Sequence, residues 1–149
     1  MGRIITFRGL LGDGGQEPIH LQTIDGTTGY RVIKFQLMPE KPGTTDYEHI
    51  MKIWKIKQTT IDESINFSDS ILLGAAFTEG AAATNFIGNP LTVIFDQEIF
   101  NQDIYVTQKD VSANAKACNY YIELEQFKLD INANTVATLK DIRNVTAPA

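Results

Sequence analysis

The sequence predicts an all-β fold, an antiparallel β-sandwich or jelly-roll-like arrangement of about eight strands with one short C-terminal helix as a possible addition. Short runs of β-branched and aromatic residues recur along nearly the whole chain, and Gly, Pro, Asn and Asp separate them. Several runs alternate apolar and polar residues with the period of two of a half-buried strand. The 149 residues suit one hydrophobic core, so we expect a single domain over residues 1–149.

Eight segments have strand-like composition, and glycine or proline marks several of the breaks between them. Gly12-Asp13-Gly14-Gly15 and Asp25-Gly26 tolerate positive φ, while Pro39 and Pro42-Gly43 close the third segment. The expected strands are Arg3–Leu11, Pro18–Thr23, Tyr30–Met38, Ile50–Thr59, Ile71–Phe77, Leu91–Phe95, Ile104–Gln108 and Tyr120–Leu129.

The last expected strand changes its apolar phase. Tyr120, Ile122 and Leu124 share one face, which predicts a half-solvated antiparallel strand, but the apolar residues then shift to Phe127 and Leu129. A bulge near Gln126, a crossing between sheets, or a second apolar surface covered by a neighbour would each account for the shift. The segment Leu91–Phe95 is nearly continuously apolar instead, which predicts burial on both faces.

Small residues and a possible helix mark two further regions. Gly74-Ala75-Ala76 and Gly80-Ala81-Ala82-Ala83-Thr84 suit a long loop or a close contact with another subunit, and we favour the loop. Near the C-terminus, Asn134 could cap a short helix, with a final strand as the alternative. The segment Thr146-Ala147-Pro148-Ala149 reads as a loose tail or arm.

The charge balance argues against nucleic acid as a direct partner. The chain has 18 acidic and 13 basic residues, for a formal net charge of -5, whereas phosphate binding requires a concentrated Lys/Arg footprint. The nearest candidate is the series Lys52, Lys55 and Lys57, which we interpret as a solvated strand edge. No apolar run approaches the roughly eighteen residues of a membrane span, so no membrane contact is expected.

Catalytic and metal-binding groups are sparse, so we expect no enzyme and no cofactor. We interpret His20 and His49 as surface residues and Cys118, the single cysteine, as an inert thiol that leaves no intrachain disulfide. Zinc would require several Cys or His ligands at short spacing. Calcium stays open, because Asp96, Glu98, Asn101 and Asp103 place oxygen ligands close together along the chain, although the EF-hand pattern is absent.

Aromatic side chains are the candidates for contacts. Trp54 shares a face with Ile50 and Ile56, which favours a core position over a sugar-stacking platform. Tyrosines suit surfaces that are wet on one side, because the ring is apolar and its tip is polar. With the phase shift added, the expected interface residues are Tyr105, Tyr121, Phe127 and Leu129.

Three segments resemble small virion structural proteins of marine bacteriophages. They are Thr28-Gly29-Tyr30-Arg31-Val32-Ile33-Lys34-Phe35-Gln36-Leu37-Met38-Pro39, Ile94-Phe95-Asp96-Gln97-Glu98-Ile99-Phe100-Asn101-Gln102-Asp103-Ile104-Tyr105-Val106, and Asn119-Tyr120-Tyr121-Ile122-Glu123-Leu124-Glu125. The likeness continues through Val136-Ala137-Thr138-Leu139-Lys140-Asp141-Ile142-Arg143 and covers about half of the chain. None of these strings is a catalytic signature.

The resemblance implies a β-sandwich or jelly-roll subunit of a phage particle, made in the host cytoplasm and located in the virion. It further implies a capsid decoration or cement protein that associates with itself and with other virion proteins such as the major capsid protein, and it carries over no site residues. The acidic composition favours an outer position or a ring over a surface facing the genome. The alternative is a carbohydrate- or cell-surface-binding module, which includes a tail or receptor-binding component.

Overall fold

The computed structural model describes residues 2–23, 26–42, 46–80 and 92–129. Their regular structure is entirely β, as expected from the alternating pattern. The eight strands are β1 (Arg3–Leu11), β2 (Gln16–Ile19), β3 (Thr28–Pro39), β4 (Tyr47–Trp54), β5 (Leu72–Gly80), β6 (Thr92–Phe95), β7 (Ile104–Asp110) and β8 (Cys118–Lys128).

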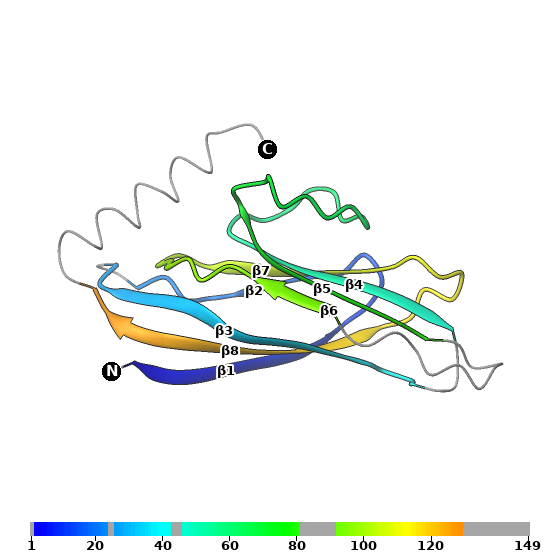
Figure 1. Ribbon diagram of the computed structural model, residues 1–149, viewed down its shortest axis with the longest axis horizontal. Coiled ribbons are helices and arrows are strands. Elements are labelled where there is room, and N and C mark those ends of the chain that lie inside the picture. The colour runs from blue at the N-terminus through cyan, green and yellow to red at the C-terminus, as the bar shows by residue number, and fades with distance from the viewer. Residues whose placement is uncertain (1, 24–25, 43–45, 81–91, 130–149) are drawn as a thin grey trace.

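The strands form two antiparallel sheets that pack face to face as in a β-sandwich (Figure 1). One sheet has three strands in the order β1-β8-β3, and the other has five in the order β2-β7-β4-β5-β6. Three pairs are nested, since β1 pairs with β8, β2 with β7 and β4 with β5. Such nesting is typical of a jelly roll, in which an antiparallel ribbon folds back on itself. The predicted fold class is therefore confirmed.

The inner faces of both sheets supply one core. On β8, Tyr120, Ile122 and Leu124 are buried and alternate with partly exposed residues, which confirms the predicted half-solvated strand. Met51 and Ile53 of β4 lie opposite in the same cluster and are 0% exposed. Removal of this apolar surface from water supplies the main stabilising free energy.

The outer face of the five-stranded sheet is also covered, because residues 55–71 cross it between β4 and β5 (Figure 1). The crossing is anchored at Gln16, whose Nε2 donates to the carbonyl of Gln58 at 3.0 Å and whose Oε1 accepts from the Gln58 amide at 2.8 Å. Trp54, Ile71 and Leu72 form a second small apolar cluster beneath it. This finding confirms the predicted core position of Trp54, which is 8% exposed.

The prediction of a solvated lysine edge is wrong for Lys52 and Lys55, whereas Lys57 is exposed. β4 is the central strand of its sheet, and the side chains of Lys52 and Lys55 are only 3% and 4% exposed. Lys52 Nζ donates to the carbonyl of Ser64 at 2.6 Å and to Asp62 Oδ1 at 3.3 Å, and the same nitrogen lies 5.2 Å from the centroid of the Trp54 ring. Lys52 therefore holds the crossing segment, and Lys55 ties its start to Glu98.

Two strands end earlier than the sequence predicted, because each meets a group from a distant part of the chain. Asp103 Oδ1 accepts hydrogen bonds from the backbone amides of Leu21 and Gln22, both at 2.8 Å, so a side chain replaces a strand partner after β2. β4 ends at Trp54 because the chain turns away there, and the Lys55 amide donates to the carbonyl of Ile71 at 2.9 Å. Carboxylates commonly satisfy backbone donors in this way.

β6 is an edge strand, not a strand buried on both faces as predicted. It pairs only with β5 among the described residues, so Val93 and Phe95 turn toward the core while Ile94 is 52% exposed. Gly74 lies opposite Phe95 within β5, and a Cβ there would stand 2.9 Å from the Phe95 Cβ. The small residues 74–76 are therefore strand residues in close packing, not a loop.

A bulge near Gln126, one of the three explanations offered for the phase shift, is absent, because β8 keeps its register with β1 and β3 at this residue. The irregularity lies in β3 instead, between Val32 and Lys34. Phe127 therefore lies on the face opposite Leu124 without any bulge in its own strand.

Three predictions fall on other parts of the chain. The small residues 81–84, the helix after Asn134 and the tail at residues 146–149 lie outside the described residues. Within the part of the chain that the structure describes, no helix is long and apolar enough to span a membrane.

Candidate functional site

The outer face of the three-stranded sheet carries exposed apolar residues. The register fixes which side chains share this face, since residues opposite one another in neighbouring strands point the same way. Ile4, Leu10 and Met38 lie on it and are 51%, 46% and 65% exposed. Single exposed apolar residues are ordinary, but three on one sheet face mark a candidate contact surface.

A groove of about 810 Å³ lies at one end of this face. Arg8 and Leu10 of β1, Tyr121 of β8, and Lys34 and Met38 of β3 all contribute to its walls. The alternation of the strands makes this combination, because Arg8 lies opposite Tyr121 and Gln36 lies opposite it on the other side. The groove therefore combines apolar surface, an aromatic ring and two cations.

Tyr121 is held in place at the centre of the groove. Its hydroxyl donates to Glu123 Oε2 at 2.7 Å, and Lys34 Nζ lies 5.9 Å from the ring centroid. The hydrogen bond to the Glu123 carboxylate raises the pKa of Tyr121, so the phenol stays protonated. A fixed ring with a polar tip suits a contact surface, because little side-chain entropy is lost when a partner covers it.

The other end of the same face holds an ion pair and Phe127. The Arg31 guanidinium contacts Glu125 Oε1 at 2.6 Å, and Phe127 is partly exposed opposite Gly29. Leu129 is 6% exposed, and its side chain packs against Gly29, where an added Cβ would lie only 2.7 Å from Leu129 Cδ2. Of the predicted interface residues, the structure thus brings Tyr121 and Phe127 to one face.

Tyr105 does not belong to this surface. It lies on β7 opposite Trp54 and packs, partly buried, against the cluster under residues 55–71. Tyr120, the neighbour of Tyr121, faces inward and is 3% exposed, with its hydroxyl donating to Glu17 Oε1 at 2.9 Å. A tyrosine-rich sequence therefore signals a possible contact, but only the strand register decides which ring reaches the surface.

β1 forms one edge of the sheet, and arginines protect it. Within the described ranges it pairs only with β8, and Arg3 and Arg8 are exposed along it. Charged residues on an edge are a common means of preventing indiscriminate strand pairing.

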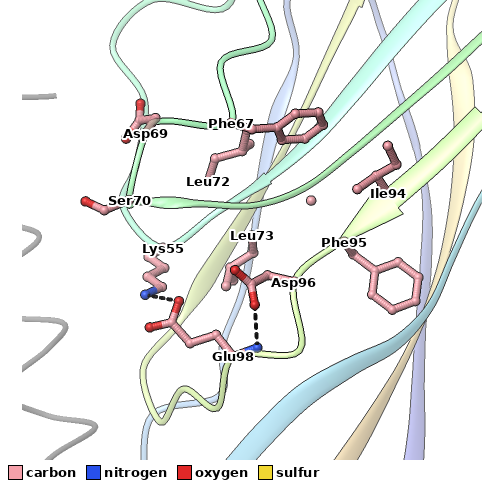
Figure 2. A pocket seen from close by; sticks show the side chains of 11 residues that line it. Lys55, Phe67, Asp69, Ser70, Leu72, Leu73, Ile94, Phe95, Asp96 and Glu98 are labelled. Atoms are coloured by element: carbon pink, nitrogen blue, oxygen red, sulfur yellow. Dashed lines mark hydrogen bonds and ion pairs between the residues drawn. The ribbon is translucent and has the colours of Figure 1, made fainter.

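A second hollow, of about 510 Å³, lies beside β5 and β6 (Figure 2). Phe67 and Ile94 project beside it, and both are mostly exposed at 62% and 52%. At its floor Lys55 Nζ contacts Glu98 Oε2 at 2.6 Å, with both side chains largely buried. Lysine and carboxylate neutralise each other there, and the rest of the lining mixes apolar residues with Asp69, Ser70 and Asp96.

The candidate catalytic groups do not converge. Cys118 is 0% exposed in the core, and burial raises the pKa of its thiol to about 12. His20 is exposed, as predicted, and its Nδ1 lies 3.1 Å from Asp103 Oδ2. A thiol without a nearby base and without solvent access is a poor nucleophile.

His49 is buried, so the prediction of a surface histidine is wrong. It lies on the inner face of β4 at 0% exposure, stacked on Tyr47 with ring centroids 5.1 Å apart. Its Nδ1 lies 3.2 Å from Gln108 Oε1, and Gln108 Nε2 donates to the carbonyls of Leu11 and Lys116. The amide oxygen therefore faces the imidazole, and His49 Nδ1 must carry the proton.

This arrangement leaves one buried nitrogen of His49 without a partner. Nε2 is the single buried side-chain N or O atom without a hydrogen bond among the described residues. Desolvation by burial lowers the pKa of His49, despite the nearby Asp110. No local pattern predicts this network, because Tyr47 and Glu48 next to His49 suggest a polar strand entrance.

The oxygen-rich segment is divided among four separate structural roles. Asp96 Oδ1 accepts from the Glu98 amide, Glu98 pairs with Lys55, Asn101 Nδ2 donates to the carbonyl of Gly26, and Asp103 binds the chain after β2. Across residues 2–23, 26–42, 46–80 and 92–129, no group of three His, Cys, Asp or Glu side chains is placed to hold a metal ion.

Comparison of the chain with protein-family models finds no match, and comparison with curated proteins finds none of significance.

Proposed function

We propose that this chain is a non-enzymatic structural protein of a bacteriophage particle, a capsid decoration or cement subunit that assembles with copies of itself and with the major capsid protein. The observation that carries the proposal is the outer face of the three-stranded sheet, which exposes Leu10 and Met38 beside the fixed ring of Tyr121, and Ile4 toward its other end. The resemblance of three segments to virion proteins of marine phages gives that surface its context.

Two further features support a role in assembly. Jelly-roll sandwiches are frequent in capsids, although a fold alone carries no function. In the described residues, Cys118 is buried and His20 and His49 lie in separate environments, so the groups available for nucleophilic catalysis are not combined. A stable fold with an exposed apolar face and uncombined reactive groups suits contact with other proteins.

The alternative, a carbohydrate- or cell-surface-binding module, gains no support from Trp54, because the ring is covered by residues 55–71. Tyr121 remains an exposed ring, so the two functions are separable by experiment. A glycan array probed with and without calcium should give no signal above a denatured control. Reproducible binding that disappears in Tyr121→Ala, with unchanged solution mass, would support the alternative.

Particle association tests the proposal directly. Purified chain should bind capsids assembled from the major capsid protein of the same phage, and electron microscopy should show added density on the outer surface in a symmetric pattern. In solution, light scattering should show a mass above the monomer. A chain that stays monomeric and is absent from sedimented particles would overturn the proposal.

A further inference from the structure

Residues 61–70 of the crossing segment, called the tip below, are both acidic and apolar. They include Asp62, Glu63 and Asp69 and no basic residue, and Ile65 and Phe67 among them are 40% and 62% exposed. The tip is also ordered, since the Ser68 amide donates to Asn66 Oδ1 at 3.0 Å. Exposed apolar side chains on a fixed backbone suit a contact in which little entropy is lost.

The tip is tied down where it meets the sheet. Lys52 reaches it from below and binds the carbonyl of Ser64 at 2.6 Å, and Asp69 Oδ1 accepts from the amide of Ile71 at 3.1 Å. Asp62 Oδ1 forms an ion pair with Lys52 Nζ at 3.3 Å, but the Asp62 side chain is still 49% exposed. Glu63 is exposed as well. The tip therefore presents negative charge to solvent beside Phe67.

The groove on the three-stranded sheet has the complementary composition. Its walls include Arg8 and Lys34 but no carboxylate, and Leu10 and Met38 give it apolar surface. Glu123 is the nearest acidic neighbour in the register, and its Oε2 accepts the hydrogen bond from Tyr121. In a chain with net charge -5, a groove whose charged walls are entirely basic is unusual, and it selects for an acidic occupant.

We propose that the acidic tip of one copy, residues 61–70 with Phe67 at its centre, docks in the groove between Arg8, Lys34 and Tyr121 of a second copy. This inference rests on the proposed function, because it names the contact through which copies assemble. Phe67 and Ile65 enter against Leu10 and Met38, and the carboxylates lie toward the two cations. The contact combines an aromatic anchor in a pocket with a charged rim.

The placement of the two surfaces determines the kind of assembly. The tip belongs to the segment that covers the outside of the five-stranded sheet, whereas the groove lies on the outside of the three-stranded sheet (Figure 1). The two surfaces are thus on opposite faces of the sandwich, and one copy cannot fill its own groove. A contact between different surfaces is heterologous, so it produces a ring or a continuing array instead of a twofold dimer.

Paired charge reversals test this contact. One variant reverses the groove with Arg8→Glu and Lys34→Glu. The other reverses the tip with Glu63→Lys, Ser64→Lys and Ser68→Lys at exposed positions, so that three lysines outweigh Asp62 and Asp69. Each alone should raise the apparent dissociation constant of self-association by at least about tenfold, because like charges then meet. An equimolar mixture should associate again, since each contact then joins a basic to an acidic surface. Sedimentation velocity measures all three samples.

Two further variants separate the contact from folding and from overall charge. Phe67→Ser should weaken self-association by at least about tenfold at an unchanged melting temperature, because the ring is mostly exposed. Lys57→Glu with Lys128→Glu is the control for the groove variant, because it also replaces two basic residues by glutamates, but at exposed positions outside the groove. This control should leave association unchanged.

Failure of the docking contact and failure of the proposed function would give different results. If the wild-type chain assembles but the groove, tip and Phe67 variants assemble equally well, the docking contact is overturned and the proposed function stands. If each reversed variant fails and their mixture also stays apart, the contact is overturned in favour of two separate interfaces. If the wild-type chain is monomeric at every concentration, the proposed self-assembly fails together with it.

Discussion

Leu124 and Phe127 lie three residues apart on β8 and face opposite sides of the three-stranded sheet. Leu124 is 0% exposed between the two sheets, whereas Phe127 is partly exposed on the outer face opposite Gly29. The strand keeps its register between them, so the two side chains report on different processes: Leu124 on folding and Phe127 on contact with neighbours.

Leu124→Ala should lower the free energy of unfolding by about 2–5 kcal/mol, because the truncation leaves a cavity in a fully buried site. Phe127→Ala should leave the monomer folded and weaken self-association instead. Urea denaturation at low protein concentration measures the first effect, and sedimentation at high concentration measures the second. If Phe127→Ala unfolds the chain as severely as Leu124→Ala, Phe127 belongs to the folding core.

His49 should make the fold sensitive to mild acid. Its pKa in the fold is lowered by burial from 6.5, so below about pH 6.5 the unfolded chain takes up a proton that the folded chain resists. Stability is therefore fully present above this pH and decreases as the pH falls below it. Melting temperatures between pH 7.5 and 4.5 should show this decrease.

His49→Gln should flatten that decrease, even if the variant is less stable at neutral pH. Asp110 titrates in a lower pH range than His49. Burial opposes its charge, but hydrogen bonds from Ser112, Lys116 and Glu48 outweigh burial and hold the pKa of Asp110 below 3.8. Its stabilising contribution is lost only at lower pH. An unchanged slope in His49→Gln would contradict the assignment.

Lys52→Ala should loosen the crossing segment. The substitution removes the ammonium that binds the Ser64 carbonyl at 2.6 Å, and we expect a loss of about 1–3 kcal/mol in the free energy of unfolding. Limited proteolysis should cut within residues 61–70 faster than in the wild-type chain, whereas Lys57→Ala, at an exposed position, should have no effect. Equal cleavage in both variants would show that Lys52 does not hold the segment.

Cys118 should resist thiol reagents in the native protein. The side chain is 0% exposed, and burial raises its pKa to about 12, so the reactive thiolate is scarce. Labelling with a disulfide reagent should be complete in urea and should proceed in buffer only at the rate of local or global opening. Stoichiometric labelling at the rate of a small free thiol would contradict this burial.

The fold could largely be predicted from the sequence, because strand alternation is a local signal. β1 has the expected bounds, and the remaining strands agree with expectation to within about five residues at each end. The disagreements arise where a distant group intervenes. Asp103 binds the backbone after β2, and β4 turns away where Lys55 meets Ile71. Such contacts join residues far apart in sequence, so no local pattern contains them.

The candidate site was predictable only in part. Alternation places Tyr121 and Phe127 opposite the core residues of β8, and the structure agrees. The groove depends on which strands flank β8, and neither the pairing with β1 nor that with β3 follows from local sequence. Burial of Lys52 and His49 was missed for the same reason: polar residues in a strand read as exposed unless a covering segment or a buried partner is known.

Copies of the chain should assemble through the outer face of the three-stranded sheet. Sedimentation velocity over a range of concentrations, with the wild-type chain beside a Leu10→Glu and Met38→Glu double variant, tests this assembly. Both replaced residues are exposed, so the variant should fold normally. We expect the wild-type chain to sediment as an assembly and the variant as a 16.6 kDa monomer. A wild-type chain that stays at 16.6 kDa throughout, or a variant that assembles equally well, would contradict the claim.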